Sequence, residues 1–152
     1  MEEISHTYNI NIKWNEGRLG TMSSPELEAE LDVATPPQFQ GGVAGVWSPE
    51  HLFVASLASC FMTTFLAIAD YSGLKFESLE IRSAGKLEKS EKIMLMTEIK
   101  ISPVLTITVE SGMEKALKIL EKAKKACLIS NSVTSSVILE PEVVIHDPAA
   151  SL

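Results

Sequence analysis

The feature that most constrains the fold is a run of 18 residues, Leu52–Ala69, without any charged side chain. Ser48 and Pro49 precede this run, and these residue types are favoured at the N-cap and at the first position of a helix. A helix beginning there can continue to about Tyr71, where a Ser-Gly pair supplies a stop. We therefore predict a helix of about 24 residues, which is about 36 Å long at 1.5 Å per residue.

A helix of this kind could in principle span a membrane, because its uncharged part reaches the lower end of the spanning range of about 17–25 residues. Four hydroxyl side chains dilute its apolarity, however, and its flanks are acidic rather than basic or aromatic. The sequence therefore favours a helix surrounded by protein and no membrane association. Since a small domain offers few ways to cover a helix on every side, we predict a homodimer with this helix near the subunit interface.

The segments before the helix alternate polar and apolar residues with the period of β-strands. Tyr8–Trp14 and Leu27–Val33 show this alternation, and Asn15–Gly17 has the composition of a hairpin turn. Two prolines and three glycines make Ala34–Trp47 a long loop.

The segments after the helix resume the alternation. A three-stranded meander is predicted over Leu79–Leu87, Ile93–Ile101 and Leu105–Val109. Val137–Ile145 again has strand character, although Pro141 restricts it to an edge or a bulge. This order predicts a single α+β domain over residues 1–152, with antiparallel sheets around a long central helix.

Composition excludes several classes of function. The chain has 13 basic and 20 acidic residues and a net charge of −7, which argues against nucleic-acid binding and against a basic membrane-docking face. Its first residues contain no basic segment followed by an apolar one, so we expect no secretory signal and a cytoplasmic location. Structural disulfides are rare in that compartment.

The chain contains two cysteines, Cys60 and Cys127. Cys60 stands in the uncharged helix, and Cys127 closes a second predicted helix, where it continues an apolar stripe formed by Met113, Ala116, Leu117 and Leu120. Both thiols are therefore expected on the core sides of different helices, as inert core residues or as a reactive pair. The three histidines are scattered and no C-x-x-C motif occurs, so the spacing indicates no metal site.

A reactive Cys60 would need a nearby cation, because a cysteine in the middle of a helix gains nothing from the helix N-terminus. The uncharged helix supplies no cation. Arg18, in the segment EGRLG, is one candidate, since arginine keeps its charge and the flanking glycines allow a close backbone approach. The alternative is an ordinary surface arginine.

Three segments together resemble the OsmC/Ohr family of hydroperoxide reductases. They are Gly17–Gly20, the stretch SPEHLFVASLASCF with Glu50 and Cys60, and the stretch ACLISNS with Cys127. They occur in the family's order and cover nearly the whole chain. The resemblance implies an OsmC-like fold, an intertwined homodimer with active sites at the subunit boundary, and thiol peroxidase activity without a metal or haem cofactor.

The resemblance also implies roles for individual residues. Cys60 would reduce an organic hydroperoxide to an alcohol, and Cys127 would resolve the resulting sulfenic acid through a disulfide. Arg18 would hold the Cys60 thiolate and polarise the peroxide, while Glu50 would orient Arg18. A dithiol, such as the dihydrolipoyl group of a lipoylated protein, would reset the pair.

Glu50 and Cys60 are ten residues apart, which corresponds to about 15 Å along a continuous helix. Glu50 cannot therefore lie beside the Cys60 of its own chain. If Glu50 serves the site, it serves the partner subunit's Cys60, which again requires a dimer.

The resemblance implies apolar pocket walls from residues such as Phe39, Phe53 and Phe61, which suit an alkyl or aryl hydroperoxide. One departure is Leu128, since the better-characterised branch often has proline after the resolving cysteine. The alternative function is a non-catalytic OsmC-like dimer that binds a small hydrophobic ligand and keeps both cysteines as core residues.

Overall fold

The computed structural model describes residues 3–148 of the 152-residue chain. The chain divides into two compact units, unit 1 up to Leu52 and unit 2 from Phe53 onwards. Strands and helices both contribute, so the α+β class is confirmed. That the two units form one domain, as the sequence predicts, stays a prediction.

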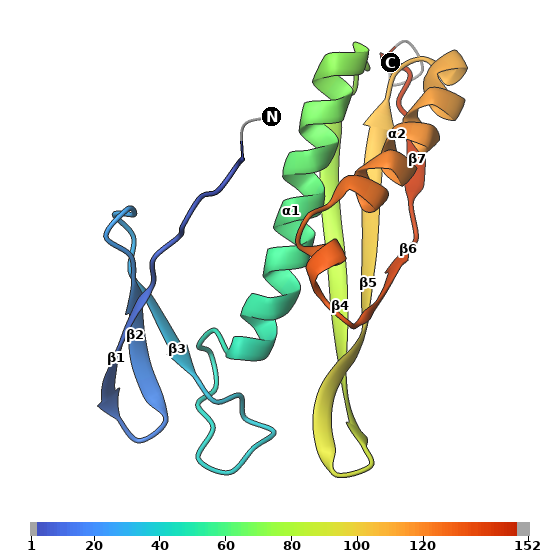
Figure 1. The fold of residues 1–152 in the computed structure, drawn as a ribbon. Coiled ribbons are helices and arrows are strands. Elements are labelled where there is room, and N and C mark those ends of the chain that lie inside the picture. Colours follow the sequence, from blue (N-terminus) through green and yellow to red (C-terminus); the bar gives the residue numbers. More distant parts are fainter. Residues whose placement is uncertain (1–2, 149–152) are drawn as a thin grey trace. The chain divides into compact units, whose positions relative to one another are not determined.

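Unit 1 contains an antiparallel sheet of three strands (Figure 1). The strands are β1, Asn11–Glu16; β2, Leu19–Ser23; and β3, Leu31–Ala34. The hairpin turn falls where the sequence predicts it, at Gly17, whose φ of 52° suits a glycine. The indole N–H of Trp14 donates to the Gly17 carbonyl at 3.0 Å. The predicted strand Leu27–Val33 begins later than expected, because only its end pairs with β2.

The uncharged segment forms α1, Pro49–Ser72, as the sequence predicts. Ser48 caps its start, since the Ser48 Oγ accepts a hydrogen bond from the backbone N–H of His51 at 3.1 Å. Gly73, with a φ of 70°, ends it. Within the described residues, α1 is the one helix long and apolar enough to cross a membrane, a test that core helices of soluble proteins also pass.

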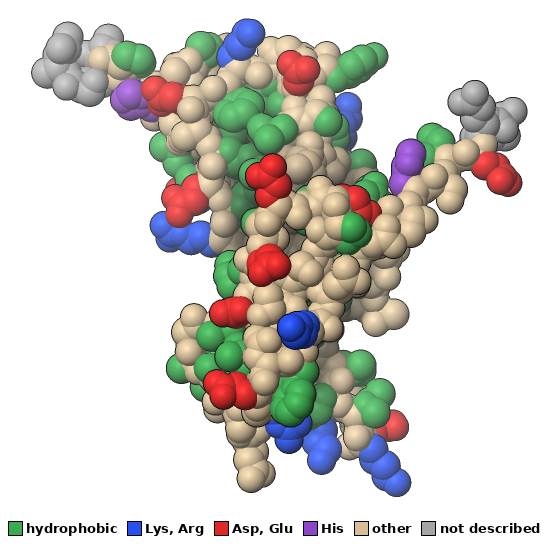
Figure 2. Space-filling model, turned by 90° about the vertical axis from the view of Figure 1, so that its left-hand side faces the viewer, with side chains coloured by type: hydrophobic (Ala, Val, Ile, Leu, Met, Phe, Trp, Pro, Cys, Tyr) green, Lys and Arg blue, Asp and Glu red, His purple; other side chains and the backbone are tan. Residues whose placement is uncertain are grey.

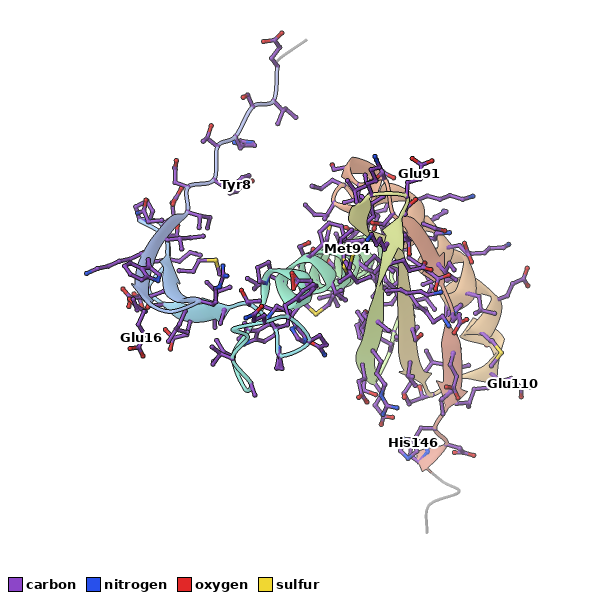
Figure 3. All side chains as sticks on the ribbon, turned by 90° about the horizontal axis from the view of Figure 1, so that it is seen from below. Tyr8, Glu16, Glu91, Met94, Glu110 and His146 are labelled. Carbon is purple, nitrogen blue, oxygen red and sulfur yellow. The ribbon has the colours of Figure 1, made fainter. Side chains whose placement is uncertain are left out.

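Unit 2 contains a four-stranded sheet. Its strands are β4, Ser78–Ser90; β5, Ile93–Ile107; β6, Ser136–Leu139; and β7, Glu142–Ile145. β4 and β5 form a long antiparallel hairpin with Glu91, at a φ of 55°, in its turn (Figure 3). β6 and β7 both pair with β5 in parallel orientation. The sheet is therefore mixed, whereas the sequence predicted antiparallel pairing.

The predicted three-stranded meander is wrong, because β5 is one continuous strand. Its Pro103 lies between two paired stretches, the one with β6 that ends at Ile101 and the one with β7 that starts at Val104. A proline lacks the N–H that a sheet ladder uses, so a gap between two neighbouring strands tolerates it. The segment Val137–Ile145, predicted as one strand with Pro141 at an edge or a bulge, is instead two strands, and Pro141 lies between β6 and β7.

The hydrophobic core of unit 2 lies between its sheet and its two long helices (Figure 1). The second of these is α2, Met113–Ala126. The main buried side chains of α1, α2 and β5 are Leu57, Phe61, Phe65, Ala69, Ile99, Ile101, Leu105, Ile107, Ala116, Ile119, Leu120 and Ala123. Gly85 of β4 permits this close packing, because a Cβ there would lie 2.4 Å from the Cγ2 atom of Val54. Leu117, which the sequence placed on the inward face of α2, is instead 38% exposed.

The face of α1 that does not pack against the core of unit 2 exposes apolar side chains in the single chain. Met62 and Leu66 are 40% and 39% exposed, two residues and six residues after Cys60. Hydrophobic side chains also reach the surface in the view of Figure 2, between acidic side chains. A single chain therefore does not surround α1, and the predicted coverage by a second subunit stays a prediction.

Candidate functional site

The structure brings the two cysteines together inside unit 2. Cys60 lies in the middle of α1 and is half-buried, whereas Cys127 is fully buried at the C-cap of α2. Both are free thiols, and they lie close enough for each to influence the pKa of the other. Two neighbouring thiols can form a disulfide once one of them has been oxidised.

Burial and neighbouring hydrogen-bonding groups of unit 2 act on the Cys60 thiol. Burial by itself raises its pKa, but hydrogen bonds from the backbone N–H of Ile129, from Cys127, from Thr64 and from the backbone N–H of Leu128 lower it. The Thr64 Oγ1 lies 3.9 Å from the Cys60 Sγ, one helical turn along α1. The net effect is a pKa below the ordinary value for a thiol, which favours the reactive thiolate at Cys60.

The Cys127 thiol has the opposite tendency. Burial raises its pKa, and the neighbouring Cys60 raises it further. Hydrogen bonds from Ser130 partly offset these effects; the Ser130 Oγ donates to the Cys127 Sγ at 3.3 Å. The net pKa of Cys127 is raised, so Cys60 is the thiol that ionises more readily.

Arg18 and Glu50 belong to unit 1. Arg18 is exposed and follows the β1–β2 turn. Its side chain packs against Gly41: a Cβ atom added to that glycine would lie 3.1 Å from the Arg18 Cγ. Glu50 lies in the first turn of α1, and its Oε2 is buried without a hydrogen-bond partner among the described residues. Within residues 3–148 the two side chains form no ion pair with each other, so the orienting role of Glu50 stays a prediction.

The three phenylalanines predicted to line a pocket occupy different surroundings. Phe39 lies in the loop of unit 1 and is 38% exposed, while Phe53 is partly buried and packs against the core of unit 2. Phe61 is fully buried within that core. It has no exposed surface in the single chain, so we do not retain Phe61 as a wall of the proposed pocket.

Sequence reasoning missed Thr64, Ser130 and the peptide groups of Leu128 and Ile129 as neighbours of the thiols. The spacing of four residues between Cys60 and Thr64 could have identified the threonine, since such residues share a helix face. No residue type marks the backbone donors, because almost every residue carries an N–H group. In the described part of the chain, no cluster of three or more His, Cys, Asp or Glu side chains is arranged to hold a metal ion.

Comparison with known proteins defines the family. The family model of OsmC-like proteins matches residues 41–142. YmaD, an uncharacterized protein of Bacillus subtilis, is 24% identical over 142 residues, which cover 90% of this chain and 93% of YmaD. An organic hydroperoxide resistance protein-like protein of Staphylococcus aureus is 25% identical over 136 residues, which cover 86% of this chain and 91% of that protein.

A solved structure confirms the fold. An OsmC-like protein of unknown function from Vibrio cholerae matches with a TM-score of 0.80 at 24% identity, over 90% of this chain and 99% of that one. The chain therefore has the fold and the family signature of an OsmC-like protein. It belongs to the OsmC/Ohr family, as the resemblance predicts.

Proposed function

We propose that this protein is a thiol-dependent peroxidase that reduces organic hydroperoxides to alcohols. The observation that carries the proposal is the proximity of two free thiols, of which Cys60 has a lowered and Cys127 a raised pKa. A peroxidase of this type needs one thiolate to attack and one thiol to resolve. The name of the Staphylococcus aureus relative, which refers to organic hydroperoxide resistance, supports the substrate class.

The proposed reaction uses the two sulfur atoms in sequence. The Cys60 thiolate attacks the outer oxygen of the hydroperoxide, the O–O bond breaks, and the alkoxide leaves with a proton as an alcohol. Cys60 becomes a sulfenic acid, and the Cys127 sulfur displaces its hydroxyl as water to form a disulfide. An external dithiol, such as a dihydrolipoyl group on a lipoylated protein, then reduces the disulfide and becomes oxidised itself.

We further propose that the active sites are shared within a homodimer in the cytoplasm. The apolar face of α1 around Met62 and Leu66 is open in the single chain, and a second subunit would cover it. Glu50, with its buried and unpartnered Oε2, would hold Arg18 near the partner's thiolate through a charge-assisted hydrogen bond. Phe39 and Phe53 would contribute apolar walls for the organic group of the substrate.

A thiol titration tests the proposed function. A slight excess of cumene hydroperoxide should remove two titratable thiols per chain and lower the mass by two hydrogens, as expected for a disulfide within the chain. Cys60→Ser should leave Cys127 titratable, whereas Cys127→Ser should leave Cys60 as a sulfenic acid that a dimedone probe captures. Retention of both thiols in the wild-type protein would instead favour the hydrophobic-ligand-binding alternative.

The reductant is tested in the same system. With dihydrolipoamide the wild-type protein should consume cumene hydroperoxide over many turnovers, whereas Cys127→Ser should not. Thioredoxin with its reductase serves as the competing donor. Turnover with thioredoxin alone would overturn the proposed dihydrolipoyl donor while leaving the peroxidase assignment intact.

A further inference from the structure

Helix α2 concentrates positive charge on a chain that is negative overall. Its 14 residues contain five lysines and two glutamates, whereas the whole chain has 13 basic and 20 acidic residues. Four of the lysines, Lys115, Lys118, Lys122 and Lys125, are exposed and follow one another at intervals of three or four residues. Residues at these intervals share one face of a helix. We call these four residues the lysine stripe.

The packing of α2 keeps the lysine stripe on the surface. The opposite side of the helix consists of buried alanine, isoleucine and leucine residues that join the core of unit 2. The Lys118 side chain is 71% exposed and pairs with Glu114, one turn earlier, at 3.3 Å. An exposed ion pair of this kind contributes little to stability, so Lys118 can exchange Glu114 for a carboxylate of a partner.

The two ends of the stripe have different surroundings. The Lys115 Nζ donates to the Ser72 carbonyl at 2.6 Å, which joins the first turn of α2 to the end of α1. At the other end, Cys127 is the C-cap of α2 and follows Lys125 by two residues. The stripe therefore extends for about 15 Å, from the end of α1 to the buried thiol.

The surface along the stripe is hollowed. An open cavity of about 370 Å³ has Lys115, Lys118 and Lys122 on its α2 side and Ser72 at the end of α1. Glu114 also borders it. Within residues 3–148, Lys122 forms no ion pair. The cavity thus presents ammonium groups to a partner, one of which has no carboxylate of its own.

A row of exposed ammonium groups is complementary to a chain that carries several carboxylates. The net charge of −7 repels nucleic acids and anionic membranes, so this local positive surface favours an acidic segment of another protein. Complementary charges speed the encounter of two proteins and fix their relative orientation. A partner aligned on the stripe would reach Cys127 at its end.

We propose that the lysine stripe is the docking surface for an acidic segment of the dithiol protein that reduces the Cys60–Cys127 disulfide. One thiolate of the partner attacks one sulfur of the disulfide, forms a mixed disulfide and releases the other cysteine. The second thiol of the partner then displaces the remaining cysteine, so the partner leaves oxidised and both cysteines are reduced. This resetting role rests on the proposed function, whereas the preference of the stripe for acidic chains does not.

Binding is tested with two fluorescent peptides that each carry one oxidised lipoyl-lysine, flanked by glutamates in one and by glutamines in the other. Fluorescence anisotropy at low salt should show about three- to tenfold tighter binding of the glutamate peptide. The preference should vanish at about 0.5 M NaCl, because salt screens exposed charges. Lys118→Gln combined with Lys122→Gln should remove most of it. Lys86→Gln combined with Lys89→Gln, which removes the same charge from β4, is the matched control and should keep it.

Three results would overturn the docking surface. They are equal binding of both peptides to the wild-type protein, a preference that survives in the double variant at Lys118 and Lys122, and tighter binding of a single-stranded DNA of the same charge. Circular dichroism checks that the double variant folds. If it does not fold, the salt dependence of the wild-type protein decides, and a preference that salt leaves unchanged overturns the proposal.

The resetting role is tested on protein oxidised with diamide, so that no peroxidase activity is needed. The reduced glutamate peptide should restore two titratable thiols per chain faster than the reduced glutamine peptide, and the double variant at Lys118 and Lys122 should lose this advantage. Equal rates in the wild-type protein would overturn the resetting role. Failure of diamide to form the disulfide would count against the proposed function, and the binding test would still decide whether the stripe docks acidic chains.

Discussion

Unit 1 and unit 2 place their apolar side chains differently. In unit 1 the alternating residues before and within β1 are exposed, with Tyr8 at 83%, Ile12 at 67% and Trp14 at 72% (Tyr8 in Figure 3). In unit 2 the apolar side chains of the helices and the sheet form a buried core, in which Phe61 and Phe65 have no exposed surface. Unit 2 thus has a buried core of its own, whereas the sheet of unit 1 has an apolar face that we expect a second subunit to cover.

The division also separates the parts of the proposed site. Unit 2 holds both thiols and the donors around them, while Arg18 and Glu50 belong to unit 1. If the dimer is intertwined, unit 1 of one chain completes the site in unit 2 of its partner. Four experiments test this comparison, and they are arranged by the size of the expected effect.

The largest effect is expected from subunit complementation. Cys60→Ser and Glu50→Ala chains should each be nearly inactive as homodimers. After mixing and refolding, half of the dimers pair one chain of each kind and contain one intact site, so activity should recover to about a quarter of wild type. A coupled peroxide assay measures it. Recovery no greater than the sum of the two homodimers would place Glu50 outside a shared site.

The next effect concerns the core of unit 2. Phe61→Ala should lower the free energy of unfolding by about 3–5 kcal/mol, because it leaves a cavity in a fully buried position. Tyr8→Ala, an aromatic truncation in unit 1, should change the same quantity by less than about 0.5 kcal/mol. Urea denaturation followed by circular dichroism gives both values. Equal losses would remove the distinction between the two units.

A smaller effect is expected on assembly. The wild-type protein should be a dimer at micromolar concentration, and Ile12→Asp should weaken the dimer by about tenfold or more, since a charge would be buried against the partner. Asn11→Asp, which adds the same charge on the opposite face of β1, is the control. Light scattering across a dilution series measures the shift. A monomeric wild-type protein would contradict the predicted homodimer.

The smallest effect concerns the thiolate. Because the pKa of Cys60 is lowered and that of Cys127 is raised, alkylation should be most selective for Cys60 at low pH. Selectivity should fall as rising pH ionises Cys127. Arg18→Ala should raise the pH midpoint of Cys60 alkylation if unit 1 supplies a cation, whereas Lys13→Ala should not. An unchanged midpoint would mean that unit 2 stabilises the thiolate alone.

The start and end of α1 could be predicted from sequence because helix ends depend on neighbouring residues. Ser48 provides a hydroxyl for the first turn, and Gly73 accepts the positive φ that ends the helix. The same reasoning failed for β5. The predicted meander placed a break between Ile101 and Leu105, where Pro103 lies. Whether a proline breaks a strand depends on whether a partner strand needs its N–H, and that partner comes from residues 136–145.

The sequence by itself determined the uncharged helix, the α+β class and, through the resemblance, the residues of interest, Cys60, Cys127, Arg18 and Glu50. These rest on local periodicity, capping and motif identity, which a linear chain displays directly. Only the tertiary structure decided that Cys60 comes close to Cys127, that the peptide groups of Leu128 and Ile129 influence the pKa of Cys60, and that the two pKa values shift in opposite directions. The reason is physical: burial and hydrogen bonding depend on which distant segments touch, and backbone donors leave no trace in residue type.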